Sequence, residues 1–235
     1  MVKVFEKDFR TKVYEDEHSA ITSEDTKNFI RFNSFDSLSK IFKKVHAKII
    51  ITKPLVELQN ILSFFTFFPG SRAIWIYRNY RDVAFSNIAH FGVKNGHNNL
   101  RPILSNEQNN WRSQNLPVKI REVVQKYFDD ETSSYDAAAL FWYVRNALFF
   151  ELNLDKRNDV AMCKYEDFVQ NPKDNMRRIY SFFQINYPGD KIVDEVHSRA
   201  TGKGKTIELS APIENLCKDL YEKMEQAYNE CLKKQ

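Results

Sequence analysis

AIWIYRNYRDVAFS, residues 73–86, is the stretch that decides the fold of this 235-residue chain. Its first five residues are apolar and mostly β-branched or aromatic, which is typical of a buried strand. The residues after Arg78 follow a helical pattern that continues through Phe91 and ends at Gly92. Because a helix N-terminus offers unpaired N–H groups and an arginine adds two parallel donors, the stretch predicts a phosphate site on an α/β sheet. The pattern leaves a second interpretation equally open, in which Arg78 and Arg81 pair with surface carboxylates.

The composition predicts one globular domain over residues 1–235. The chain is 43% hydrophobic and 28% charged, and its net charge of +4 permits an anionic ligand without indicating a nucleic-acid partner. The longest apolar stretch, residues 49–68, contains charged and polar side chains, so we expect no transmembrane segment. The three cysteines, Cys163, Cys217 and Cys231, are odd in number and widely spaced, which predicts reduced thiols and a cytoplasmic location. Without a cysteine pair or an H-E-x-x-H motif, we predict no catalytic metal.

Strand and helix patterns alternate along the chain, which predicts an α/β fold with a parallel sheet flanked by helices. The strand candidates are residues 11–14, 48–52, 72–77 and 159–164. Helices are expected over residues 55–65 and 135–154 and after Pro172 and Pro212. Residues 95–117 are polar, rich in asparagine and poorly periodic, so we expect a long loop there that shapes a substrate pocket.

Residues 78–86 also resemble the R-D-P-R-D-V-x-x-S signature of the PAPS-dependent sulfotransferases, whose donor is 3′-phosphoadenosine 5′-phosphosulfate. In this chain Asn79 and Tyr80 stand where that signature often has Asp-Pro. Other segments resemble further family elements in the family's order. They are Lys53-Pro at the end of a strand, the Y-E-D element that begins at Tyr165, SFFQI at residues 181–185, and HSRATGK at residues 197–203.

The resemblance implies a P-loop NTPase-like fold and the transfer of a sulfuryl group from PAPS to a hydroxyl or amine of an acceptor. It places Arg78 and Ser86 at the 3′-phosphate of the donor and Tyr165 close to its adenine. The segment that contains Arg199, Gly202, Lys203 and Lys205 is expected to close over the nucleotide.

Candidate catalytic residues follow from the same resemblance. Sulfuryl transfer needs a base for the acceptor proton and cations at the reacting group. Glu15 fits the position of the base best, Asp16 comes next, and His18 is an alternative. An equally open interpretation is that this acidic cluster is a solvated turn. Lys53 lies at a predicted strand end and is a candidate partner of the sulfonate or 5′-phosphate, or else forms a surface ion pair.

One family element has no match in the sequence. Sulfotransferases carry a P-K-x-G-T-T-W or R-S-G-S-T-W loop for the 5′-phosphosulfate, and GKGKT at residues 202–206 is not a substitute because Arg199 stands where a Walker A loop needs glycine. We expect the first strand and this loop to lie upstream of Met1, so that residues 1–235 alone would be poorly soluble and nearly inactive. The alternative is a catalytically inactive remnant that binds PAP-type nucleotides, and a third, weaker hypothesis is a P-loop kinase.

Overall fold

The structure is a computed structural model that describes residues 2–3, 19–20, 29–32 and 58–234. It divides into two compact units, Met1–Pro69 and Gly70–Gln235, which are described separately here. The predicted strands at residues 11–14 and 48–52 lie outside the described residues, as do Glu15, Asp16, His18 and Lys53. The prediction of a single domain over residues 1–235 stays a prediction.

The described residues of the first unit form short strands and one α-helix. The strands β1 (Val2–Lys3) and β2 (Ser19–Ala20) each pair antiparallel with β3 (Phe29–Phe32). A 3₁₀ turn, η2 (Leu58–Asn60), leads into α3 (Ile61–Phe67). The helix predicted over residues 55–65 is therefore confirmed where that range is described.

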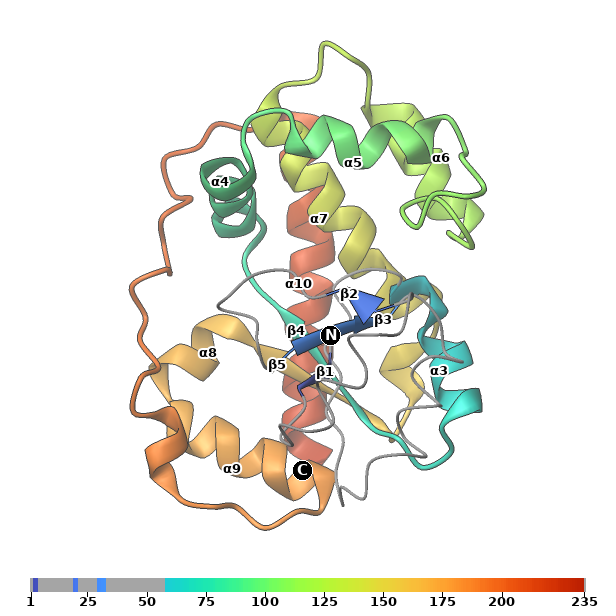
Figure 1. Ribbon diagram of the computed structural model, residues 1–235. Helices are drawn as coiled ribbons and strands as arrows, with labels where there is room; N and C mark the ends of the chain where they lie inside the picture. Colours follow the sequence, from blue (N-terminus) through green and yellow to red (C-terminus); the bar gives the residue numbers. More distant parts are fainter. Residues whose placement is uncertain (1, 4–18, 21–28, 33–57, 235) are drawn as a thin grey trace. The chain divides into compact units, whose positions relative to one another are not determined.

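The second unit is built on two parallel strands, β4 (Ala73–Tyr77) and β5 (Val160–Lys164). Their register runs from Ala73 beside Val160 to Tyr77 beside Lys164, so both strands end at the same edge (Figure 1). In β4 the side chains of Trp75 and Tyr77 are buried, whereas Ile76 between them is 63% exposed. The alternation reflects the two-residue period of a strand with one buried face. The predicted α/β fold with a small parallel sheet is confirmed.

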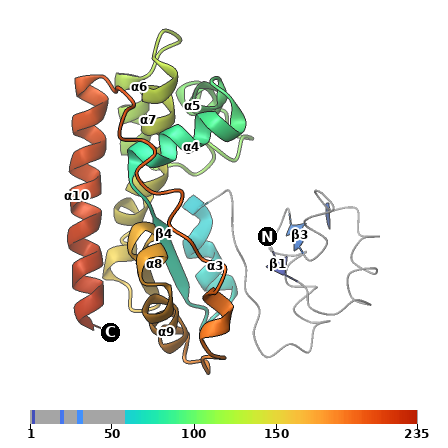
Figure 2. The ribbon, with the colours of Figure 1, turned by 90° about the vertical axis from the view of Figure 1, so that its left-hand side faces the viewer.

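Helices flank this strand pair on both sides. In chain order they are α4 (Tyr80–Phe91), α5 (Asn95–Leu104), α6 (Val118–Tyr127), α7 (Ser134–Glu151), η3 (Leu154–Lys156), α8 (Tyr165–Gln170), α9 (Pro172–Phe183), η4 (Asp190–Val193) and α10 (Ala211–Lys234). Figure 2 shows α10 running along one side of the strand pair. The predicted helix end before Gly92 and the predicted helix start at Pro172 are both confirmed.

The core of the second unit surrounds α7, which packs against α4, α5, α6 and α10. Ser133 precedes α7, and its hydroxyl accepts a hydrogen bond from the Asp136 N–H at 3.1 Å, the usual N-cap arrangement. Val144 and Leu148, which follow each other at i+4 spacing on α7, are fully buried. Apolar side chains on almost every side of α7 make it the central helix of the unit, and this is why its sequence shows little one-sided pattern.

The prediction of a long loop over residues 95–117 is wrong for its first part. Residues 95–104 form α5 despite Pro102, and only the residues after Leu104 make turns. The helix is stable because Gly96, Leu100 and Ile103 all lie on its buried face. A Cβ at Gly96 would lie 2.7 Å from the backbone of Ala137, so the absence of a side chain there lets α5 approach α7 closely.

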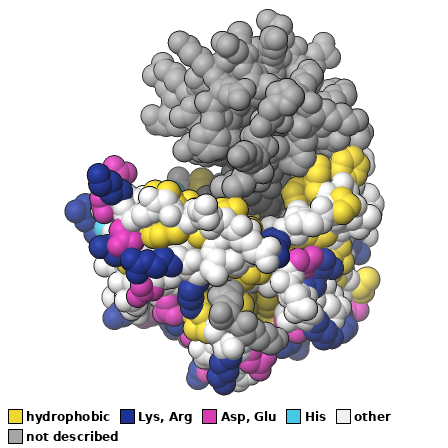
Figure 3. All heavy atoms as spheres, turned by 90° about the horizontal axis from the view of Figure 1, so that it is seen from below, with side chains coloured by type: hydrophobic (Ala, Val, Ile, Leu, Met, Phe, Trp, Pro, Cys, Tyr) yellow, Lys and Arg dark blue, Asp and Glu magenta, His cyan; other side chains and the backbone are white. Residues whose placement is uncertain are grey.

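The surface of the second unit carries both signs of charge. On the face seen in Figure 3, basic, acidic and apolar side chains are interspersed. Across the described ranges, no three His, Cys, Asp or Glu side chains are placed to hold a metal ion. No helix of the described part combines the length and the apolar character needed to cross a membrane.

Candidate functional site

Arg78 and Tyr165 are brought together by the parallel pairing of β4 and β5. Each is the first residue after its strand, and the last pair of the register is Tyr77 beside Lys164. The guanidinium carbon of Arg78 lies 4.8 Å from the centre of the Tyr165 ring. At this distance the cation is attracted to the ring face. Two residues predicted to bind the same nucleotide therefore lie side by side at the carboxyl edge of the sheet, where ligands bind in open α/β sheets.

The turn between Arg78 and α4 is held by hydrogen bonds from both sides. The Asn79 side-chain oxygen accepts from the Arg81 N–H at 3.0 Å, which caps the helix. The backbone N–H of Asn79 donates to Glu166 Oε1 at 2.9 Å, so the segment after β5 also fixes the turn. Asn79, which replaces the usual Asp of the signature, thus preserves the cap.

Asp82 joins the first turn of α4 to a segment far along the chain, residues 199–207, which we call the C-terminal strap. Its two carboxylate oxygens accept hydrogen bonds from the N–H groups of Gly202 and Gly204, each at 2.7 Å. Asp82 is only 4% exposed. Gly204 has no room for a side chain, since a Cβ there would collide with the backbone of Arg81 and Asp82. The strap therefore lies directly against the N-terminus of α4.

The side chain of Arg78 is surrounded by these elements. It donates to the carbonyl of Ala200 in the strap and lies 3.4 Å from Asp82. Its own carbonyl accepts from the indole N–H of Trp142 on α7 at 2.9 Å. The Arg78 Nε is buried and has no hydrogen-bond partner among the described residues. A buried donor left without a partner is costly, and an anionic oxygen would satisfy it.

The other predicted nucleotide contacts lie around this point. Ser86 follows Asp82 at i+4 spacing on α4 and therefore lies on the same face of the helix. Ser86 is half-buried, and the described residues give its hydroxyl no hydrogen bond. In the strap, Arg199, Lys203 and Lys205 are exposed, and none of them takes part in an ion pair with another described residue.

Arg81 has the more ordinary role, an ion pair with a carboxylate. Its guanidinium lies 2.8 Å from Glu214 of α10 and donates to the carbonyl of Ile207 at 2.6 Å. The Tyr80 hydroxyl donates to the same carboxylate at 2.6 Å. Burial, together with the Glu214 carboxylate, raises the pKa of Tyr80 to about 12. Arg81 thus connects α4, the strap and α10, and its guanidinium is not available to a ligand.

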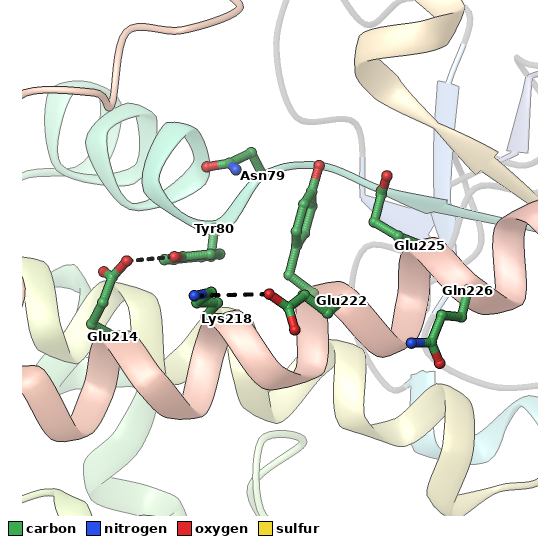
Figure 4. Close-up of a pocket in the computed structure, with 8 residues that line it drawn as sticks. Asn79, Tyr80, Glu214, Lys218, Glu222, Glu225 and Gln226 are labelled. Atoms are coloured by element: carbon green, nitrogen blue, oxygen red, sulfur yellow. Dashed lines mark hydrogen bonds and ion pairs between the residues drawn. The ribbon is translucent and has the colours of Figure 1, made fainter.

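A cavity of about 640 Å³ lies beside this ion pair, between α10 and the start of α4 (Figure 4). Among its lining residues are three carboxylates, Glu214, Glu222 and Glu225, and one cation, Lys218, which lies 3.9 Å from Glu222. Arg78 does not line it. Because carboxylates repel a phosphate, this cavity does not fit an anionic nucleotide, and the Arg78 side of the sheet fits one better.

Sequence reasoning missed Asp82, Glu166 and Trp142 as residues that hold the site. Asp82 offered a signal, since an acidic side chain in the first turn of a predicted phosphate-binding helix needs a partner other than the phosphate. Trp142 is buried, and its bond to the Arg78 carbonyl comes from tertiary packing. Glu15, Asp16 and Lys53 cannot be placed relative to Arg78, because they lie outside the described residues.

A strand-end arginine, an aromatic ring on the neighbouring strand end and a glycine-containing strap with exposed cations thus meet at one edge of the sheet. Searches of curated proteins and of solved structures found no match to the chain. A family model of the sulfotransferase domain matches residues 57–215, about two thirds of the chain, and includes every described residue of the site. The chain belongs to the sulfotransferase domain family.

Proposed function

We propose that this protein transfers a sulfuryl group from PAPS to a hydroxyl or amine of an acceptor. The observation that carries the proposal is the contact of Arg78 with both the Tyr165 ring and the C-terminal strap. It gathers, at one edge of the sheet, three segments for which the family resemblance implies a nucleotide-binding role. Membership of the sulfotransferase family supports a transferase activity of this class.

In the proposed site Arg78 and Ser86 bind the 3′-phosphate, and Tyr165 lies against the adenine. The buried, unsatisfied Nε of Arg78 supports this role, since it has a hydrogen bond left to donate. The strap residues Arg199, Gly202, Lys203 and Lys205 close the site over the nucleotide. When bound, PAPS supplies the sulfuryl group, and the protein's part is to position the reactants and to stabilise negative charge.

The proposed catalytic residues lie outside the described part of the chain. Glu15, or else Asp16, is proposed to take the proton of the acceptor, and Lys53 to neutralise charge at the sulfonate or 5′-phosphate. Both roles come from the family resemblance alone.

The experiment compares nucleotide binding with turnover. Calorimetry measures the affinities of wild type, Arg78→Ala and Ser86→Ala for 3′-phosphoadenosine 5′-phosphate (PAP) and for AMP. Arg78→Ala should weaken PAP binding by about 1.5–3 kcal/mol and AMP binding much less, since only PAP carries the 3′-phosphate. Ser86→Ala should act in the same direction but more weakly, because it removes one neutral donor. Arg101→Ala, which removes an exposed arginine paired with an exposed Asp130, is the matched control.

Turnover is then measured as desulfation of PAPS in the presence of a panel of hydroxyl and amine acceptors. Acceptor-dependent desulfation that is lost in Arg78→Ala supports the proposed activity. Specific PAP binding without any desulfation would favour the inactive nucleotide-binding relative instead. Equal effects of Arg78→Ala on PAP and AMP would remove Arg78 from the 3′-phosphate role.

A further inference from the structure

Two arginines that have no part in the proposed nucleotide site lie beside one indole ring in the second unit. The guanidinium carbon of Arg112 lies 4.2 Å from the centre of the Trp111 ring, and that of Arg145, on α7, lies 5.7 Å from it. We call Trp111, Arg112 and Arg145 the Trp111 cluster. Trp111 and Arg112 come from the turns between α5 and α6, so two segments of the unit meet here.

Within the described part of the chain, neither arginine of the cluster forms an ion pair with a carboxylate. None of the ion pairs among the described residues includes Arg112 or Arg145, and the one hydrogen bond that either guanidinium donates there runs from Arg112 Nε to Asn99 Oδ1, at 2.6 Å. Burial and the neighbouring Arg112 lower the pKa of Arg145 to about 10, so both side chains remain charged at neutral pH. The pKa of Arg112 is also lowered, chiefly by burial, although Glu107 acts against this.

Such an arrangement is unfavourable unless something compensates it. Two like charges repel each other, and a desolvated charge without a partner is costly. The contacts with the Trp111 ring recover only part of this cost. Clusters of cationic side chains with shifted pKa values are typical of binding sites, where an anionic ligand neutralises the charge.

The Trp111 cluster lies close to the proposed nucleotide site through α7. Arg145 follows Trp142 at i+3 spacing on this helix, and the Trp142 indole donates to the carbonyl of Arg78. Residues at that spacing have their Cβ atoms about 5–6 Å apart on a helix surface. The next residue, Asn146, accepts a hydrogen bond from Trp75 of β4, so this part of α7 lies against the strand that leads to Arg78.

We infer that the Trp111 cluster binds an anionic group of the acceptor, a carboxylate or a sulfate, and so selects acidic acceptors. The inference rests on the proposed sulfotransferase function and adds the chemical class of its second substrate. Two guanidinium forks can each hold an oxyanion through two parallel hydrogen bonds. A neutral acceptor would leave both cations without compensation and would bind more weakly. The sulfonate and 5′-phosphate of the donor are the other oxyanions available to the protein, and the experiment separates them from the acceptor.

The experiment uses a matched pair of probes, 4-hydroxybenzoate and 4-hydroxybenzamide, which differ in the negative charge. Their affinities for the whole protein are measured by NMR titration at low salt with PAP at saturation. The variants are Arg112→Gln, Arg145→Gln and the charge-keeping Arg145→Lys. The control is Lys119→Gln, which removes an exposed cation elsewhere in the unit. Circular dichroism verifies folding; if Arg145→Gln does not fold, Arg112→Gln and Arg145→Lys carry the test.

The wild type should bind the benzoate at least tenfold more tightly than the benzamide. Arg112→Gln and Arg145→Gln should each abolish most of this difference, Arg145→Lys should keep part of it, and Lys119→Gln should leave it unchanged. Equal affinities for the two probes, no binding of either, or a preference unaffected by both glutamine variants would overturn the inference. Displacement of the benzoate by PAP would also overturn it, because the cluster would then belong to the donor site.

The same titrations are repeated in Arg78→Ala protein without nucleotide. A wild type that binds no PAP but still prefers the benzoate through Arg112 and Arg145 would contradict the proposed function and leave an oxyanion site at the cluster. A wild type that binds PAP but shows no preference for the benzoate would contradict only the inference.

Discussion

The guanidinium of Arg78 lies 4.8 Å from the centre of the Tyr165 ring, and this contact joins the carboxyl ends of β4 and β5. The contact exists because the two strands are parallel and in register up to their last residues. It holds the Arg78 side chain in place, which would reduce the cost of ordering this side chain when the proposed nucleotide binds.

Replacement of Tyr165 tests this orientation. Tyr165→Phe keeps the ring and should change the affinity for PAP only slightly. Tyr165→Ala removes both the ring under Arg78 and the proposed adenine contact, and it should weaken PAP binding by about 1–3 kcal/mol. Calorimetry measures both variants. Similar losses in Tyr165→Phe and Tyr165→Ala would assign the effect to the hydroxyl and not to the ring.

Asp82 is predicted to hold the C-terminal strap on α4. Asp82→Asn loses the negative charge and can accept only through one oxygen, so one strap N–H loses its partner. We expect a loss of stability of about 1–3 kcal/mol and faster hydrogen exchange at residues 199–206. Asp155→Asn, an exposed change in the same unit, is the control.

Bound nucleotide should slow hydrogen exchange in the strap, whereas Asp82→Asn should speed it up. We predict that saturating PAP slows exchange over residues 199–206 in the wild type, because the exposed cations Lys203 and Lys205 gain an anionic partner. If PAP left exchange unchanged in this segment, the strap would be only a structural connection between η4 and α10.

The close approach of α5 to α7 predicts an unusual response at Gly96. Alanine is a better helix former than glycine by about 1 kcal/mol, so Gly96→Ala would stabilise a helix with free space around it. Here the added Cβ meets the α7 backbone at 2.7 Å, and we expect destabilisation by about 1–3 kcal/mol. Urea denaturation measures it, with Asn98→Ala on the exposed side of α5 as the control. A stabilised Gly96→Ala protein would show that α5 can move away from α7 at little cost.

The raised pKa of Tyr80 predicts a loss of stability in alkali. Burial and the Glu214 carboxylate raise this pKa to about 12, whereas tyrosine in an unfolded chain titrates near 10. The folded protein therefore keeps its proton where the unfolded chain loses it, so the contribution to stability is complete below about pH 10 and is lost between about pH 10 and 12. Thermal denaturation from pH 8 to 12 should show a shallower decline for Tyr80→Phe than for the wild type. Parallel curves would mean that Tyr80 does not contribute to this decline.

The strand, turn and helix around Arg78 were predictable because their pattern is local. A five-residue apolar strand, an N-terminal cap and a terminal glycine lie within residues 73–92 and depend little on the rest of the chain. The helix α5 was missed because its asparagines and Pro102 lower its intrinsic propensity, while the packing of Gly96, Leu100 and Ile103 on α7 stabilises it.

For the candidate site, the sequence named segments but not the bonds between them. The family resemblance named Arg78, Tyr165 and the strap, and the structure brings them together, while their role in binding a nucleotide stays a prediction. No periodicity in the sequence indicates that Asp82 accepts from Gly202 and Gly204. The cluster of Trp111, Arg112 and Arg145 was equally hidden, because its two arginines come from separate elements that meet only in the folded unit.

The bond between Asp82 and the strap also bears on how the protein is made. Gly202 follows Asp82 by 120 residues, and a ribosome takes on the order of 10 s to synthesise that length. Throughout this interval the Asp82 carboxylate lacks the amides of Gly202 and Gly204. The Arg78 side chain likewise lacks the Ala200 carbonyl. During synthesis, therefore, α4 and the strand pair can assemble first, and the edge of the sheet around Arg78 acquires its final geometry only after the strap has left the ribosome.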